Sequence, residues 1–139
     1  MNILCVDDEP DIRAILEIAL SFDPDIHADI VESGIEALEL AATRKYDLIV
    51  LDGLMPGLDG YSTCGLLKAN EVTANVPVVF LTANLQRAQR ESALSGGAER
   101  IIEKPFDPMT LAMQLRLEIK RASRKSSLDD RSLATQADA

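Results

Sequence analysis

The sequence lacks the features that several large classes of protein need. It has no excess of basic charge, because 14 Lys and Arg residues stand against 23 Asp and Glu residues and give a formal net charge of −9 at pH 7. Binding to nucleic acid or to a membrane surface needs a basic patch, so we expect neither from this chain. No apolar stretch approaches the about 20 residues that a transmembrane helix requires. Residues 1–8 carry no basic region and end on two acids, so we expect no secretory signal.

Cysteine and histidine are also scarce. Cys5 lies inside an apolar run and Cys64 inside a helical pattern, which predicts two small core residues rather than a metal-binding pair. Reduced thiols suit a cytoplasmic protein, and this is the location we expect. The single histidine, His27, falls on an expected edge strand and is interpreted as a surface residue rather than a phospho-donor or a metal ligand. No G-x-G-x-x-G motif follows the first apolar run, which argues against a nucleotide-binding module.

What the sequence does contain is a regular alternation of short apolar runs and helical patterns along 139 residues, a length that suggests one domain. A continuous apolar run between turn residues is typical of a strand buried on both faces of a parallel sheet. Apolar residues that recur every three or four positions indicate amphipathic helices. The expected strands are residues 3–6, 27–31, 48–51, 78–81 and 101–102, and the expected helices are residues 10–20, 34–43, 60–69, 85–95 and 108–121.

This alternation predicts an α/β fold with a parallel sheet. The first, third and fourth runs are apolar throughout and are expected at the centre of the sheet, whereas the mixed second run and the very short fifth run are expected at its edges. The result is a flavodoxin-like (βα)5 doubly wound parallel sheet with strand order 2-1-3-4-5. We assign residues 1–121 to this domain. In residues 122–139 Ser, Lys, Asp and Ala dominate without periodicity, which indicates a flexible tail or the start of a linker.

Polar side chains follow four of the five expected strands. The first strand ends at Asp7 and Asp8, the third at Asp52 and the fourth at Thr82, and the fifth leads to Lys104. Parallel strands end at one edge of the sheet, so these side chains are expected to converge there. Neighbouring carboxylates repel one another unless a cation lies between them, and Mg²⁺ with several waters and a phosphate oxygen suits such a site. Acids, a hydroxyl and an ammonium group together indicate phosphoryl transfer.

Taken alone, Asp52 is equally well explained as a residue that ends a strand and begins a turn. The motifs around it and along the chain, however, resemble those of the receiver domain of two-component response regulators, over about residues 1–121. Each motif alone is weak, but the set in this order is highly specific. The matching motifs are Val6-Asp7-Asp8-Glu9, Leu51-Asp52-x-x-Met55-Pro56-x-x-Asp59-Gly60, Leu81-Thr82-Ala83 and Lys104-Pro105-Phe106.

The resemblance implies a role for each acid. Asp52 is the expected phospho-acceptor, which takes a phosphoryl group from the phosphohistidine of a histidine kinase or a phosphotransfer protein. Asp8 and Asp52 are expected to bind Mg²⁺ together with the backbone carbonyl of Leu54, and Asp7 to act through a metal-bound water. A cluster of three carboxylates repels an incoming phosphoryl group, so we expect phosphorylation to depend strictly on the metal.

The resemblance also implies roles beyond the acids. Lys104 is expected to pair with one phosphoryl oxygen and Thr82 to donate a hydrogen bond to another, while the small Ala83 leaves the phosphoryl group room. The Lys104-Pro105 peptide bond corresponds to the cis X-Pro bond of the family.

The sequence departs from the family pattern three residues before the lysine, where receivers usually carry Tyr or Phe and this chain has Ile101. Thr82 and residue 101 are the expected switch residues, and the aromatic side chain that the family usually has at position 101 is missing here. We expect the signal to pass through the Thr82 loop and the polar helix after it; the alternative is that Ile101 is simply an edge-strand residue. Leu54 and Asn84 occupy two positions that tune phosphoryl lifetime in the family, and an apolar Leu54 is a hypothetical shield against water.

The last expected helix carries two apolar stripes. Met109, Met113 and Leu117 form the second, at i, i+4 and i+8. This stripe could contact a partner or join two copies into a homodimer. Alternatively, it widens the stripe that faces the core.

The leading functional hypothesis is a phosphorylation-controlled signalling module, not a turnover enzyme, whose output is binding to a downstream protein. No output domain follows residue 121, so the chain is expected to be either a stand-alone receiver or the receiver part of a longer protein. A metal-dependent aspartyl phosphohydrolase is the alternative from another class, but haloacid-dehalogenase-like enzymes need a second acid where this chain has Leu54. A phosphorylation-independent adaptor is disfavoured by the complete set of acids, threonine and lysine.

Overall fold

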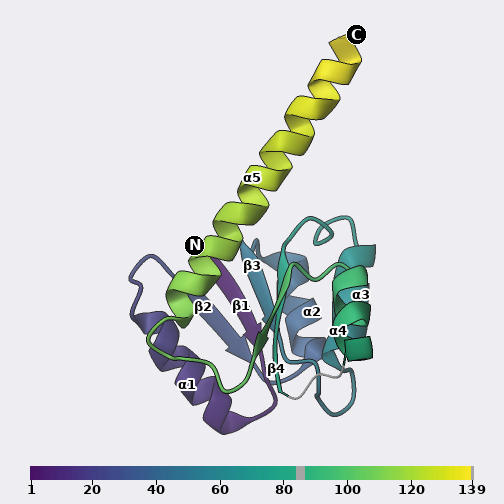
Figure 1. Cartoon of the computed structure of the whole chain (residues 1–139). Coiled ribbons are helices and arrows are strands. Elements are labelled where there is room, and N and C mark those ends of the chain that lie inside the picture. Colours follow the sequence, from purple (N-terminus) through teal and green to yellow (C-terminus); the bar gives the residue numbers. More distant parts are fainter. Residues whose placement is uncertain (84–86, 139) are drawn as a thin grey trace.

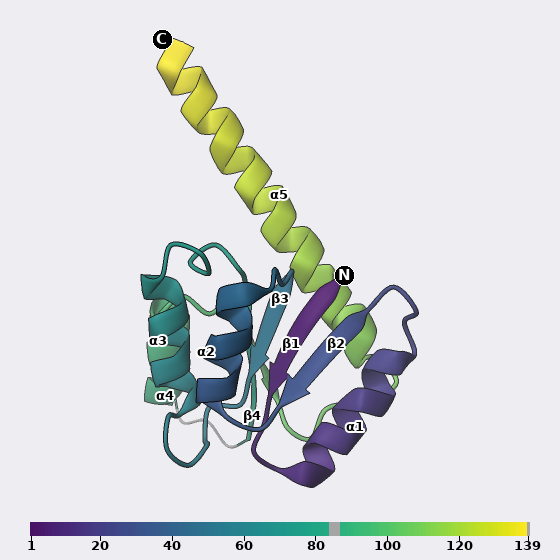
Figure 2. The same ribbon diagram turned by 180° about the vertical axis from the view of Figure 1, so that it is seen from behind.

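The chain folds into one sheet covered by helices, and the computed structural model describes residues 1–83 and 87–138. The strands are β1 (Asn2–Val6), β2 (His27–Val31), β3 (Leu48–Leu51), β4 (Val78–Thr82) and β5 (Arg100–Glu103). The helices are α1 (Pro10–Ser21), α2 (Gly34–Thr43), α3 (Gly60–Ala69), α4 (Arg87–Ser95) and α5 (Leu111–Asp138). All strand pairs are parallel, in the order β2-β1-β3-β4-β5, which confirms the predicted flavodoxin-like sheet. α1 and α5 cover one face, and α2, α3 and α4 cover the other (Figures 1 and 2).

The burial of each strand follows its place in the sheet. β3 and β4 are buried along their whole length and β1 after its first residue, whereas the edge strands β2 and β5 are partly exposed. Successive side chains of a strand point to opposite faces, so Ile3 packs beneath α1 and α5 while Leu4 packs beneath α2 and α3. Cys5 and Cys64 are buried and free, and His27 is exposed, as the sequence predicted.

Helix α5 differs from its prediction at both ends. It begins at Leu111 rather than at residue 108, because the Asp107 carboxylate accepts a hydrogen bond from the backbone N–H of Met109 at 2.9 Å and a turn precedes the helix. It ends at Asp138 rather than near residue 121. The missing apolar periodicity of residues 122–138 argued against packing, but these residues include no Gly or Pro that would stop a helix. Figure 1 shows this extension of α5 projecting away from the sheet.

The second apolar stripe of the last helix does not face the core. Met109, Met113 and Leu117 are 71%, 63% and 45% exposed, so the alternative of one wide core-facing stripe is wrong. On the other face of the sheet, the predicted start of the fourth helix at Leu85, and Asn84 before it, lie outside the residues that the structure describes. No helix in the described part of the chain is long and apolar enough to cross a membrane.

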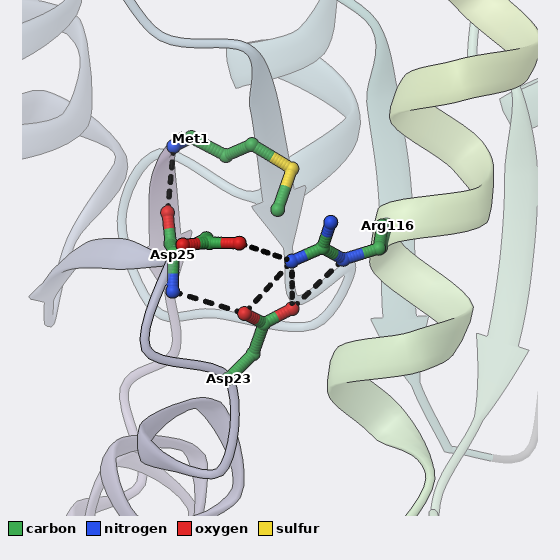
Figure 3. Close-up of polar contacts among 4 residues, drawn as sticks. All are labelled: Met1, Asp23, Asp25 and Arg116. Carbon is green, nitrogen blue, oxygen red and sulfur yellow. Dashed lines mark hydrogen bonds and ion pairs between the residues drawn. The ribbon is translucent and has the colours of Figure 1, made fainter.

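An ion-pair cluster ties the chain together where the strands begin (Figure 3). We call it the base clamp; it consists of Met1, Asp23, Asp25 and Arg116. The Arg116 guanidinium of α5 donates to both carboxylate oxygens of Asp23, at 2.6 to 2.9 Å, and to Asp25 at 3.1 Å. The amino group of Met1 donates to the backbone carbonyl of Asp25 at 2.7 Å. The clamp therefore joins β1, the α1–β2 loop and α5 at one end of the sheet.

Candidate functional site

The opposite end of the sheet, where the strands finish, brings together the polar residues that the sequence placed there. We call Asp7, Asp8, Asp52, Thr82 and Lys104 the rim site. Lys104 Nζ lies 2.7 Å from Asp7 Oδ2 and 3.5 Å from Asp52 Oδ2. Carboxylate oxygens of Asp7, Asp8, Asp52 and the exposed Glu9 all lie within 4.8 Å of one another. Glu9 was not among the predicted site residues, although its position directly after two acids was a signal for it.

Backbone hydrogen bonds between neighbouring strands position these side chains. Asp52 N donates to Val6 O at 2.9 Å, which sets the end of β3 beside the end of β1. Lys104 N donates to Thr82 O at 3.0 Å, which does the same for β5 and β4. The Asp7 carboxylate accepts a hydrogen bond from Glu9 N at 3.0 Å and is thereby held in place. The site is thus a consequence of strand register.

The loop after Asp52 is shaped by a close approach at Gly60. A Cβ atom at Gly60 would lie 2.1 Å from the carbonyl oxygen of Asp52, so only glycine fits there. The preceding residue, Asp59, begins α3 by accepting a hydrogen bond from Ser62 N at 2.7 Å. Leu54 N donates to Asp52 Oδ1 at 3.2 Å. The Asp-Gly pair of the motif therefore turns the chain back against the residue that bears the candidate acceptor carboxylate.

The rim site is buried and carries more acid than base. Asp7 and Asp52 are 1% and 3% exposed. Burial and then the charge of Asp7 raise the pKa of Asp52, and Lys104 opposes that shift. Burial lowers the pKa of Lys104, but the hydrogen bond to Asp7 and the charges of Asp7 and Asp52 outweigh it and leave that pKa raised. Lys104 is accordingly a fixed ammonium group between two buried carboxylates.

Three buried oxygen atoms of the rim site have no hydrogen bond of good geometry among the described residues: Asp7 Oδ2, Asp8 Oδ1 and Thr82 Oγ1. Asp7 Oδ2 is ion-paired with Lys104 Nζ at 2.7 Å, which leaves Asp8 Oδ1 and Thr82 Oγ1. Buried polar atoms are normally paired, so each of these two points to a group that binds there. A carboxylate oxygen among other carboxylates suits a hard divalent cation, and a free hydroxyl suits an anionic acceptor. The donor set therefore fits Mg²⁺ and a phosphoryl group.

The remaining predicted positions lie around the rim site. The Leu54 side chain is 57% exposed, and its backbone lies two residues after Asp52. Ile101 pairs with Phe80 across β4 and β5 and packs partly buried against the core beneath α2, α3 and α4. The Lys104-Pro105 peptide bond is cis, as the resemblance implied. Thr82 is fully buried at the end of β4, and Ala83 follows it half-buried.

Comparison with known proteins identifies the family. The profile of the response regulator receiver domain matches residues 3–116. The transcriptional regulatory protein ResD of Bacillus subtilis is 36% identical over 125 residues, which cover 90% of this chain and 50% of ResD. The chain spans about half the length of the curated relatives it matches.

Solved structures agree with this match. The receiver domain of Francisella response regulator 1452 aligns with a TM-score of 0.77 and 30% identity, over 86% of this chain and 97% of that one. A CheY-like receiver domain protein of Methanospirillum hungatei aligns with a TM-score of 0.79 over 89% of this chain and 97% of its own, and at 21% identity it supports the fold alone. The chain belongs to the response regulator receiver domain family, the signalling modules of two-component systems.

Proposed function

We propose that Asp52 accepts a phosphoryl group from the phosphohistidine of a histidine kinase or a phosphotransfer protein, and that the phosphorylated state binds a downstream protein differently. The observation that carries this proposal is the arrangement of the buried Asp52 carboxylate with Lys104 Nζ at 3.5 Å and the other acids around it. The assignment of the individual residues rests on this geometry and on the family's motifs.

Each residue of the rim site has a part in the transfer. A carboxylate oxygen of Asp52 attacks phosphorus as the P–N bond breaks, and the imidazole leaves neutral because its other ring nitrogen carries a proton. Lys104 balances charge on one phosphoryl oxygen, and the unpaired hydroxyl of Thr82 donates to another.

Asp8, Asp52 and the backbone carbonyl of Leu54 are the candidate Mg²⁺ ligands, with Asp7 acting through water. When bound, the metal neutralises the negative charge that otherwise repels the phosphoryl donor.

The finer properties of the module belong to the same proposal. It is a self-phosphorylating acceptor with slow dephosphorylation rather than a turnover enzyme, it is cytoplasmic, and it does not itself bind nucleic acid or membranes. The exposed stripe of Met109, Met113 and Leu117 is the candidate surface for a homodimer. Residues 122–139 are the candidate linker to a further part of a longer protein, as the relatives' greater length suggests.

An aspartyl phosphohydrolase is a weaker candidate. Such an enzyme needs a second acid two residues after the nucleophile to protonate the leaving group. That position is Leu54, an exposed apolar side chain. The chain therefore lacks the acid at the place where turnover requires it.

Intact-mass analysis tests the proposed function directly. The chain is incubated with a small phosphodonor such as acetyl phosphate, with Mg²⁺ or with excess chelator, in parallel with Asp52→Asn. We expect the mass of one phosphoryl group to be gained only by the parent chain and only with Mg²⁺. Labelling of Asp52→Asn, or efficient labelling in chelator, contradicts the assignment.

A further inference from the structure

One side chain outside the rim site, that of Tyr61, also has a buried polar atom without a hydrogen-bond partner among the described residues. Tyr61 lies in the first turn of α3, and its ring stacks on Phe80 of β4 with 5.1 Å between ring centroids and 22° between planes. Its hydroxyl is buried and has no hydrogen-bond partner within residues 1–83 and 87–138. A buried hydroxyl without a partner is unfavourable, so any rearrangement that supplies an acceptor is stabilised.

The hydroxyl of Tyr61 lies against the residue that follows the candidate phospho-acceptor. A Cβ atom at Gly53 would be 2.8 Å from Tyr61 Oη and 3.0 Å from Tyr61 Cζ, so the phenol fills the space that a larger residue 53 would take. Burial, then Asp59 and Asp52, raise the pKa of Tyr61. The phenol is therefore a neutral hydrogen-bond donor that interacts electrostatically with the negative charge of Asp52.

The other side of the Tyr61 ring borders α4. A pocket of about 180 Å³ between α3 and α4 is lined by Tyr61, Cys64 and Phe80 on one side and by Ser92, Ala93 and Gly96 on the other. The Cys64 thiol donates to the carbonyl of Gly96 at 3.9 Å across this boundary. The ring consequently touches the acceptor loop at one end and has room to move beside α4 at the other.

We propose that Tyr61 is a positioning residue that couples the phosphorylation of Asp52 to α4. This inference rests on the proposed function. A phosphoryl group on Asp52 adds charge and acceptor oxygens one residue from Gly53, and it draws the unpaired hydroxyl toward the acceptor loop. The ring then shifts against Phe80, the pocket changes shape, and the contact of α3 with α4 at Ser92, Ala93 and Gly96 rearranges. The coupling uses an aromatic side chain on α3, whereas residue 101 on β5 is aliphatic.

Fluorescence of a single tyrosine tests the first step. The chain has two tyrosines and no tryptophan, so Tyr46→Phe leaves Tyr61 as the only emitter. We expect the emission of this variant to change when Mg²⁺ and beryllofluoride, a mimic of a bound phosphoryl group, are added together, and to stay constant when Asp52→Asn is also present. Unchanged emission from a variant that mass analysis shows to be phosphorylated overturns the inference while leaving the proposed function intact. Absence of phosphorylation overturns both.

Hydrogen exchange tests the second step, the rearrangement of the contact between α3 and α4. It is measured in the parent chain and in variants with one tyrosine replaced. We expect phosphorylation to alter amide exchange at residues 92–97, and this response to be lost in Tyr61→Phe although the variant is labelled to the same extent. Tyr61→Phe keeps the ring and removes only the hydroxyl. If the ring has only a structural role, the exchange response of Tyr61→Phe will equal that of the parent, and this result overturns the inference. Tyr46→Phe is the matched control, because the Tyr46 hydroxyl donates to Asp29 at 2.6 Å, away from the acceptor loop; its response should equal that of the parent.

Discussion

The two ends of the sheet carry similar residues in opposite circumstances. The base clamp pairs two aspartates with Arg116, and the rim site surrounds Lys104 with aspartates. At the base, the guanidinium fork donates to both oxygens of Asp23 and also reaches Asp25, so a planar cation meets acids whose geometry matches it. At the rim, one ammonium group meets at least three carboxylates, and Asp8 Oδ1 stays unpaired.

The difference shows what separates a structural ion pair from a binding site. Solvent reaches parts of the base clamp, and Arg116 and Asp23 satisfy each other there. Asp7 and Asp52 at the rim are nearly inaccessible, Asp8 is half-buried, and the acids outnumber the cation, so their repulsion is relieved only by a further positive charge. We therefore expect matched substitutions at the two ends to have different and sometimes opposite effects.

The largest expected difference concerns the lysine and the arginine. Lys104→Ala should slow phosphorylation by acetyl phosphate by about 10²- to 10³-fold, the usual cost of removing one preorganised donor from a transferring group. Arg116→Ala should be labelled at the parent rate, because its guanidinium lies at the other end of the sheet. Both rates are measured by intact mass over time with Mg²⁺. A comparable loss in both variants would show that the effect comes from the fold and not from the rim site.

Gly60 and Gly65 offer a second contrast, within α3. Gly60→Ala should destabilise the chain by about 3 kcal/mol, since its Cβ would lie 2.1 Å from a backbone oxygen that cannot move aside easily. Gly65→Ala meets no atom within 4 Å and should stabilise the helix by about 0.5–1 kcal/mol. Urea denaturation followed by circular dichroism measures both. Equal effects would mean that the approach of Gly60 to Asp52 is not constraining.

An Asp→Asn substitution should change the stability of the chain in opposite directions at the two ends of the sheet. Asp52→Asn should stabilise the metal-free chain at neutral pH, because burial and Asp7 raise the pKa of Asp52 and make its charged form unfavourable. Asp23→Asn should destabilise the chain, because it removes the partner of Arg116. Thermal unfolding at pH 7 in chelator compares them, and a destabilised Asp52→Asn would contradict the description of the rim as strained by its own charge.

The smallest expected effect is the acid sensitivity of the base clamp. The hydrogen bond from Arg116 lowers the pKa of Asp23 below its ordinary value, so Asp23 contributes stability above its unfolded pKa, about 4, and loses it as the pH falls through the lowered value. The difference in unfolding midpoint between the parent and Arg116→Ala should thus shrink as the pH is reduced from 7 toward 3. A difference that does not change with pH would mean that Arg116 acts through packing alone.

Much of the fold and of the candidate site was predictable because it depends on local patterns. The wholly apolar runs at residues 48–51 and 78–81 identified central strands, and the strand order followed from which runs were expected to be covered on both faces. The convergence of the rim-site residues was predictable because parallel strands all end at the same edge of the sheet. The extent of α5 was not predictable in this way, since helix without an apolar stripe has no periodic signal.

The amino-acid sequence by itself determined where the five strands lie along the chain, though not their exact ends, together with the strand order and the meeting of Asp7, Asp8, Asp52, Thr82 and Lys104 at one edge. It could do so because the spacing of apolar residues, the burial that this spacing implies and the direction of the chain are all properties of short segments. Only the tertiary structure decided that the Tyr61 hydroxyl lies beside Gly53 without a partner among the described residues and that Arg116 closes the opposite end. Those contacts join residues far apart along the chain or depend on how a side chain turns, and distance and direction are set by packing.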